Sequence, residues 1–241
     1  MLLVVAAGAA VAVAGIALPR HTTSVRTYAE PLHRVVVRLA SGKVTLVADR
    51  QLGARVTATR HFTLRTPAVT SHVESGVLTV AGACPKPTIL TCRIDLRIGV
   101  SPEMAVDVAT GSGDVRVENV AGSVRVRSSA GAVAIVGLTG TADVRTSAGP
   151  ISGQGLAVTR LRAGTAAGAI GLAFAVAPDS VSASTGAGDV DLALPDESYR
   201  VTTSAPAGRA RVLVPVDADA SRTVAVRTAA GRITVRRAPP M

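Results

Sequence analysis

One short sequence pattern recurs seven times between Val106 and Val235, and it restricts the fold more than any other feature of this chain. Each copy is centred on a glycine that follows a small residue and has alternating apolar residues on both sides. The copies follow one another at intervals of roughly 20 residues, which is typical of solenoids built from stacked coils. The seven glycines are Gly113, Gly131, Gly149, Gly168, Gly188, Gly208 and Gly231.

The apolar residues alternate with a period of two, which indicates half-buried strands. They stand at odd offsets before the glycine, as Val106 and Val108 do before Gly113, and at even offsets after it, as Val115 and Val117 do. This change of phase requires the chain to turn a corner at the glycine, which tolerates a positive φ because it has no Cβ atom. A hydroxyl residue stands three positions before most of the glycines, so coils that stack in register would form a ladder of hydroxyl groups.

We therefore predict an all-β fold: a single-stack parallel β-helix, or solenoid-like repeat array, preceded by an N-terminal apolar helix. An antiparallel meander or sandwich with glycine hairpins would give a similar period and stays open as the alternative. The array is predicted to occupy residues 32–237, with a divergent N-terminal part at 32–101 and regular repeats at 102–237. Residues 19–31 are predicted to be a linker. Aromatic residues make up only 2% of the chain, which suits a narrow core.

The N-terminus and the cysteines indicate an exported protein. Residues 1–18 contain no charged side chain, and this length suits either a signal peptide or a membrane anchor. We predict a disulfide between Cys84 and Cys92, which fits an oxidising compartment, with two unpaired buried thiols as the alternative. The expected location is the cell envelope, with the protein either membrane-anchored through its N-terminal segment or secreted.

The formal net charge is +10, and arginine supplies almost all of the positive charge. This excess has two interpretations: a solvated surface, or attraction to an anionic envelope polymer or lipid. Nucleic acid is not an expected partner, because single-stranded bases need aromatic stacking platforms that this chain lacks. The candidate contacts with an anionic surface are Arg116, Arg125, Arg127 and Arg145.

No catalytic, cofactor-binding or metal-binding pattern is recognised, so we expect a protein that is not an enzyme and needs no cofactor. Asp107 and Asp143 occupy equivalent positions two coils apart with Arg125 between them, which predicts a charge ladder across coils. An aspartate follows the glycine in only two copies, whereas calcium-binding nonapeptide repeats need one in each. The four histidines all precede the regular repeats and lack metal-ligand spacing.

The repeated turns resemble those of bacterial putative-adhesin domains, a β-strand-repeat family of unknown function that follows an N-terminal membrane segment. The segments Thr110-Gly111-Ser112-Gly113-Asp114-Val115 and Thr185-Gly186-Ala187-Gly188-Asp189-Val190 carry the resemblance, which extends over about residues 34–237. The resemblance implies a β-helix-like domain in the envelope and transfers no catalytic residues.

The leading functional hypothesis is a non-catalytic cell-envelope protein that acts as an adhesin or surface-binding module. A membrane-associated accessory or signalling scaffold is the alternative, and a polysaccharide-active enzyme is less favoured. An uncapped last coil could also pair edge to edge, so self-association is open.

Overall fold

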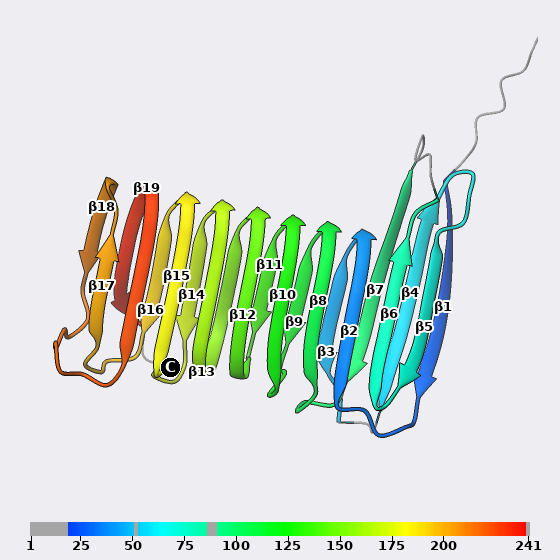
Figure 1. Cartoon of the computed structure of the whole chain (residues 1–241), viewed down its shortest axis with the longest axis horizontal. Coiled ribbons are helices and arrows are strands. Elements are labelled where there is room, and N and C mark those ends of the chain that lie inside the picture. Colours follow the sequence, from blue (N-terminus) through cyan, green and yellow to red (C-terminus); the bar gives the residue numbers. More distant parts are fainter. Residues whose placement is uncertain (1–18, 51–52, 86–90, 240–241) are drawn as a thin grey trace, which may run out of the picture.

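The structure is a computed structural model that describes residues 19–50, 53–85 and 91–239. The predicted signal peptide or apolar helix at residues 1–18 lies outside this part of the chain. Every regular element described is a strand, and the strands form one long stack with two faces (Figure 1). Neighbouring regular coils pair in parallel, which confirms the predicted solenoid and excludes the antiparallel meander for these repeats. Among the described residues, no helix has the length and apolar character that crossing a membrane requires.

Each regular coil contributes a longer strand to one face and a shorter strand to the other. In spatial order, the long-strand face consists of β5 (Ala68–Glu74), β6 (Val77–Ala83), β2 (Arg34–Ser41), β8 (Ala105–Ser112), β10 (Ser123–Ala130), β12 (Thr139–Ala148), the second half of β13 (Ile151–Ala167), β15 (Ser180–Ala187), the first half of β19 (Thr223–Arg237) and β17 (Arg200–Ser204). The short-strand face consists of β1 (Arg20–Tyr28), β4 (Ala54–Phe62), β7 (Cys92–Val100), β3 (Val44–Ala48), β9 (Val115–Glu118), β11 (Val133–Val136), the first half of β13, β14 (Ile170–Phe174), β16 (Val190–Leu194), the second half of β19 and β18 (Ala207–Val212).

The core is the narrow layer between the two faces, and it is filled by the alternating apolar residues. Val108 and Val126 on the long-strand face have no exposed surface, and neither have Val117 and Ile135 on the short-strand face. The predicted hydroxyl ladder is present on the long-strand face. Its members are buried and in register, and they are Thr110, Ser128, Thr146, Thr165, Thr185 and Thr228. The hydroxyls at the C-terminal end of the ladder donate to the carbonyl oxygens of the glycine column described next, at 2.9–3.2 Å.

The repeated glycines form a continuous column along one edge of the stack, at the corner between the faces. The N–H of Gly131 donates to the carbonyl of Ala148 in the next coil at 3.0 Å, and the N–H of Gly149 donates to that of Ala167 at 2.9 Å. A Cβ atom on Gly149 would lie only 2.2 Å from the carbonyl oxygen of Gly131. Six of the seven predicted turn glycines also have a positive φ. Glycine is therefore required at this corner by close approach and by backbone conformation together.

The two ends of the stack depart from chain order. The Gly208 coil, β17 and β18, lies outermost, while the later β19 is inserted between it and β15 and β16. Gly208 does not have a positive φ, but its Cβ would still lie 1.8 Å from the carbonyl oxygen of Gly231. At the other end, β2 and β3 are likewise inserted between β6 and β7 on one side and β8 and β9 on the other.

The prediction that residues 19–31 form a linker is wrong. Residues Arg20–Tyr28 form β1, which pairs antiparallel with β4 over its whole length. Arg26 and Tyr28 pair with the buried Val56 and Ala54, so their side chains face inward, where both donate hydrogen bonds to the Ser71 hydroxyl of β5. These bonds tie the two faces together at the N-terminal end, and an inward-facing charge there blocks further strand pairing.

The rest of the N-terminal part, residues 32–101, mixes parallel and antiparallel pairing. Its first coil, β2 and β3, belongs to the regular array, whereas β5 and β6 form an antiparallel hairpin. The positive φ angles of Ser75 and Gly76 make the tight turn of this hairpin. Cys84 and Cys92 form the predicted disulfide, which links the segment after β6 to the start of β7 and so joins the two faces.

Asp95 on β7 is a carboxylate of this N-terminal part with several polar neighbours. It accepts two hydrogen bonds from the Arg93 guanidinium at 2.8 Å and one from the backbone N–H of Lys43 at 3.1 Å, and His61 Nε2 lies 3.3 Å away. Burial alone would raise its pKa, but the hydrogen bonds from Arg93 and Lys43 and the charge of Arg93 outweigh this effect. The pKa of the Asp95 carboxyl is therefore lower than its usual 3.8.

The glycine column predicts an asymmetry between two alanine substitutions. Gly149→Ala should lower the free energy of unfolding by about 3 kcal/mol, because the methyl group meets the neighbouring carbonyl and the residue is strained at positive φ. The control is Gly171→Ala on β14, where a Cβ meets nothing within 4 Å and φ is not positive. This control should change stability by less than about 1 kcal/mol. Guanidinium unfolding of both variants makes the comparison, and equal losses would contradict the role of the column.

The lowered pKa of Asp95 predicts a pH-dependent contribution to stability. Because the folded-state pKa is the lower one, the contribution is complete above the unfolded value of 3.8 and disappears as the pH falls through the folded value. Asp95→Asn should therefore cost about 1 kcal/mol at neutral pH and progressively less in acid. Urea unfolding across pH measures the difference, with Asp219→Asn in an exposed loop as the control. A cost that stays constant into strong acid would refute this explanation.

Candidate functional site

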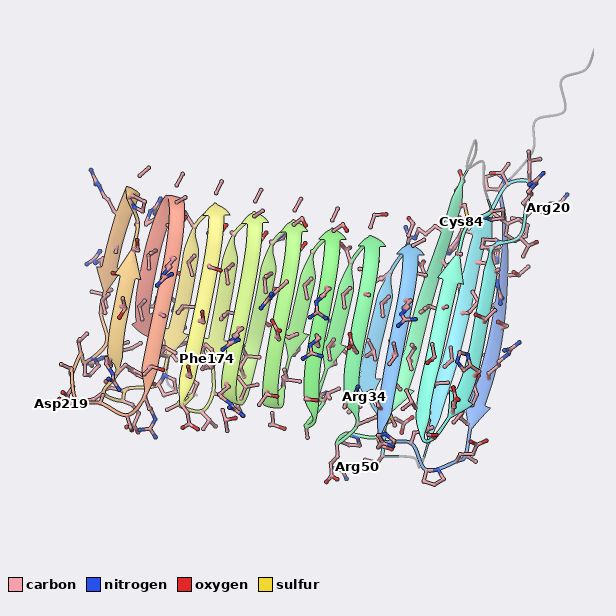
Figure 2. All side chains as sticks on the ribbon, in the orientation of Figure 1. Arg20, Arg34, Arg50, Cys84, Phe174 and Asp219 are labelled. Atoms are coloured by element: carbon pink, nitrogen blue, oxygen red, sulfur yellow. A yellow bond between two sulfur atoms is a disulfide. The ribbon has the colours of Figure 1, made fainter. Side chains whose placement is uncertain are left out.

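The outward positions of the long-strand face gather a large share of the arginines. Because side chains alternate along each strand, the residues between the buried ones all point away from the core. We call this surface the arginine face; Figure 2 shows Arg34 near its N-terminal end. Its arginines are Arg34, Arg38, Arg125, Arg127, Arg145, Arg160, Arg162, Arg200 and Arg227.

Few acidic residues balance this charge. On the outward positions of the parallel strands of this face, the acidic residues are Asp107 and Asp143. Arg125 Nη1 lies 3.8 Å from Asp107, and Arg145 Nε donates to Asp143 at 3.2 Å. Arg125 is in register with both aspartates, which confirms the predicted ladder. The other arginines of the face form no ion pair with any residue that the structure describes, so the surface is positively charged.

The structure brings together three of the four predicted contact residues. Arg125 and Arg127 on β10 lie beside Arg145 on β12, with Arg127 and Arg145 directly in register. Arg116 is on β9 of the opposite face, where it pairs with Glu118. Sequence reasoning treated outward arginines as one set. The position of each arginine before or after its glycine would have assigned it to the long-strand face or the short-strand face.

The short-strand face has a different character. Its middle coils expose small uncharged residues, such as Ala134 on β11 and Gly171 on β14. Towards its C-terminal end the acidic residues are paired, because Asp191 accepts a hydrogen bond from Arg236 at 3.0 Å and Asp189 lies 3.7 Å from Arg232. Unbalanced positive charge along the middle coils is therefore a property of the arginine face.

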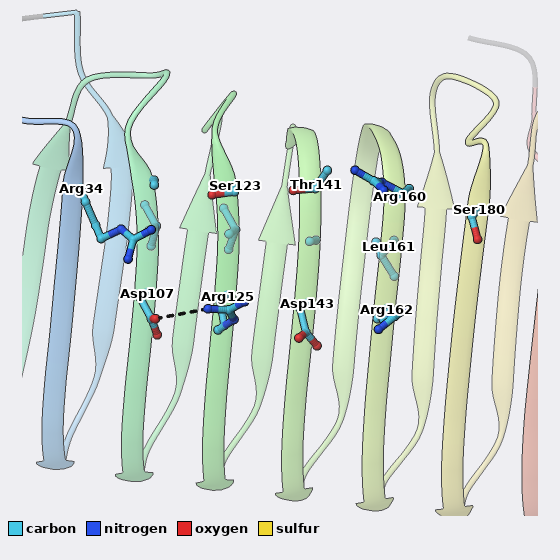
Figure 3. Close-up of a pocket in the computed structure, with 14 residues that line it drawn as sticks. Arg34, Asp107, Ser123, Arg125, Thr141, Asp143, Arg160, Leu161, Arg162 and Ser180 are labelled. Carbon is cyan, nitrogen blue, oxygen red and sulfur yellow. Dashed lines mark ion pairs between the residues drawn. The ribbon is translucent and has the colours of Figure 1, made fainter.

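A shallow groove of about 420 Å³ crosses the arginine face near the starts of its strands (Figure 3). It extends from β2 to β15, and two parallel rows of side chains line it. The first row, in spatial order, is Arg34, Ala105, Ser123, Thr141, Arg160 and Ser180. The second row is Asp107, Arg125, Asp143 and Arg162. Sequence reasoning did not find this groove, because its rows join residues from six different strands.

Outside the arginine face, a site could also lie in a metal-binding cluster or at a buried titratable side chain. Residues 19–50, 53–85 and 91–239 contain no group of three or more His, Cys, Asp or Glu side chains placed to hold a metal ion. Tyr199 is fully buried near the C-terminal end, where its hydroxyl donates to the carbonyl of Pro195. Burial raises the pKa of Tyr199 to about 12, against a smaller opposing effect of Arg222.

The outer edges of β17 and β18 have no strand beside them in the described part of the chain, so self-association stays a prediction.

A solved bacterial structure shares this fold, and two others superpose with lower scores. A putative adhesin from Bacteroides fragilis superposes with a TM-score of 0.54 at 15% sequence identity, covering 89% of this chain and 97% of that chain. A putative cell adhesion protein from Clostridium sporogenes has a TM-score of 0.44 at 9% identity, covering 90% of this chain and 100% of that chain. A putative adhesin from Parabacteroides distasonis has a TM-score of 0.44 at 14% identity, covering 89% of this chain and 97% of that chain. None of the curated proteins matches the sequence.

The family is shown by the sequence itself. Residues 16–236 match the sequence model of one family, and this stretch includes the N-terminal strands and the glycine-centred coils except the last residue of β19. The match includes both faces of the solenoid and agrees with the resemblance to putative-adhesin domains. The chain belongs to the Toastrack DUF4097 family.

Proposed function

We propose that this protein is a non-catalytic module of the cell envelope whose arginine face binds an anionic polymer or lipid surface. The observation that carries the proposal is the sorting of arginines by the coil geometry. Arg127 and Arg145 stand on neighbouring strands about 4.8 Å apart, and Arg227 continues the same row near the C-terminal end. A row of fixed cations with few acidic neighbours attracts an extended anion along its whole length.

Two features support a location in the envelope. The disulfide between Cys84 and Cys92 is stable in an oxidising compartment and is rare in the bacterial cytosol. The uncharged segment at residues 1–18 has the composition of a signal peptide or a membrane anchor. An anchor at this end would place the solenoid beside the membrane and the anionic polymers around it.

The arrangement of the carboxylates supports a binding role rather than a catalytic one. Glycoside hydrolysis uses two carboxyl groups on opposite sides of a scissile bond. Here Asp107 and Asp143 lie two strands apart, but Arg125 occupies the position between them, where a sugar would have to lie. The groove on this face is also open to solvent, whereas acid–base chemistry of this kind benefits from a desolvated site.

Binding through the arginine face should depend on salt and on specific arginines. The double variant Arg127→Ser/Arg227→Ser should bind anionic probes about 10- to 30-fold more weakly at low salt, since each surface cation contributes about 1 kcal/mol. Suitable probes are vesicles of phosphatidylglycerol and phosphatidylcholine and soluble polygalacturonate, with cosedimentation or titration calorimetry as the measurement. Affinity for both probes should fall as salt rises, because screening shortens the range of the attraction.

The matched control is Arg209→Ser/Arg211→Ser, which removes the same charge from exposed positions on the short-strand face. This control should bind within about twofold of the unaltered protein. All variants keep the same N-terminal segment, so insertion of that segment into a vesicle cannot account for a difference between them. Equal losses in the two double variants, or no binding of either probe at low salt, would contradict the proposal.

A further inference from the structure

The groove on the arginine face has a charge pattern that is more specific than a uniform cationic surface. Its second row alternates in sign across four neighbouring strands, from Asp107 through Arg125 and Asp143 to Arg162. Adjacent strands are about 4.8 Å apart, so the two arginines of this row are about 10 Å apart with a carboxylate midway between them. A ligand that places one negative charge on every strand would meet a repelling aspartate at every second position.

The first row of the groove offers hydroxyl groups between two cations. Ser123 and Thr141 are adjacent in register, and Arg34 and Arg160 stand towards the two ends of the row. Figure 3 shows the Arg34 side chain extending along the groove toward β8, and the Arg160 side chain extending toward Thr141 on β12. The row therefore presents neutral donors and acceptors in its middle and positive charge at either side.

The aspartates of the second row remain able to accept further hydrogen bonds. Asp143 accepts one hydrogen bond from Arg145, which orients the carboxylate, and the side chain is still 28% exposed. Asp107 lies 3.8 Å from Arg125 and is 31% exposed. A carboxylate has about four acceptor positions, so each aspartate can also bind a neutral ligand hydroxyl.

From this pattern we propose that the groove binds a linear acidic glycan lying along the solenoid axis, with one anionic group for every two sugars. An extended hexose is about as long as the spacing between strands, so successive sugars would lie over successive strands. Acidic sugars would face Arg125 and Arg162, and the neutral sugar between them would donate its hydroxyls to Asp143. The inference rests on the proposed function, and it names the polymer class that the same face would select.

The groove also sets the length of glycan that it can contact. It extends over six neighbouring strands, from Arg34 on β2 to Ser180 on β15. No aromatic residue lines it, so sugars cannot gain affinity by stacking and each one contributes little by itself. Affinity should therefore rise with chain length up to about six sugars and then level off, because longer chains reach beyond the groove.

The test compares two acidic hexasaccharides with the full-length protein. Hyaluronate has one carboxylate for every two sugars, whereas oligogalacturonate has one on every sugar. We expect the hyaluronate hexasaccharide to bind more tightly in titration calorimetry. The double variant Asp107→Asn/Asp143→Asn should reverse this order, gaining about threefold or more for oligogalacturonate because the repulsion is removed. Arg125→Ser/Arg162→Ser should weaken both ligands, and Arg209→Ser/Arg211→Ser should leave both unchanged.

The outcomes separate this inference from the proposed function. Tighter binding of oligogalacturonate to the unaltered protein, or an order of preference that the asparagine variant does not change, would overturn the inference. Anionic vesicles that bind while neither hexasaccharide does would also overturn it but leave the proposed function standing. Absence of salt-dependent binding to every anionic probe would refute both. The substituted arginines are exposed and the two aspartates are partly exposed, so only small changes in thermal unfolding are expected, and this measurement checks that each variant is folded.

Discussion

The close approach of backbones at the glycine column is the constraint on which the rest of the structure depends. At this corner each coil lies so near the previous one that a Cβ atom on Gly149 would occupy the place of the Gly131 carbonyl oxygen. The hydrogen bonds from the N–H groups of Gly113, Gly131, Gly149, Gly168 and Gly188 to the next coil fix the register, and the register then aligns every other position of the repeat. The hydroxyl ladder, the apolar core and the rows of outward arginines all follow from this alignment. A substitution that moves the backbones apart at the glycine column would therefore lower stability and also disturb the rows of outward arginines.

The repetition explains how much of the fold could be predicted. The alternation around Gly113 fixes which side chains are buried, and its recurrence predicts parallel stacking, because the same pattern must meet itself in the next coil. The order of coils at the ends could not be predicted in this way. The repeat occurs in the coil formed by β17 and β18 and again in the coil formed by β19. The sequence pattern alone allows either coil to lie beside β15 and β16. The inner coil buries Ile233 and Val226 where the outer coil has the smaller or more polar Ala210 and Thr203, which favours the inner place for β19.

The candidate site was predictable only in part, for a related reason. The offset of Arg125 or Arg127 from its glycine shows that the side chain points outward, but a groove requires neighbours from other coils. Arg34 and Arg160 are separated by more than half of the chain and lie in one row because β2 is inserted next to β8. The strand β1 was missed because its inward side carries Arg26 rather than apolar residues, so the chain there has the composition of a linker. Both cases involve contacts with distant segments, which local patterns do not contain.

The ends of the solenoid differ in a way that bears on the proposed binding function. At the N-terminal end, Arg26 and Tyr28 bond to Ser71 and close the layer between the faces. At the C-terminal end, the outer coil has smaller residues than the coil beneath it, and Arg209 and Arg211 project from its edge strand. Charged residues on an edge strand oppose pairing with another chain. The proposed binding therefore concerns the two broad faces, of which the arginine face has the unbalanced charge.

The central claim is that the coils stack in register and that β19 lies between β15 and the outer coil. Distances between spin labels, measured by double electron–electron resonance, test it most directly. Arg38, Arg227 and Ser204 occupy the same row of the long-strand face. With spin labels at Arg38 and Arg227, six strand spacings predict a separation of about 29 Å, and with labels at Arg38 and Ser204, seven spacings predict about 34 Å. The account predicts that the second separation is longer. A shorter separation to Ser204 than to Arg227 would mean that the coils stack in chain order, which would contradict the inserted strand.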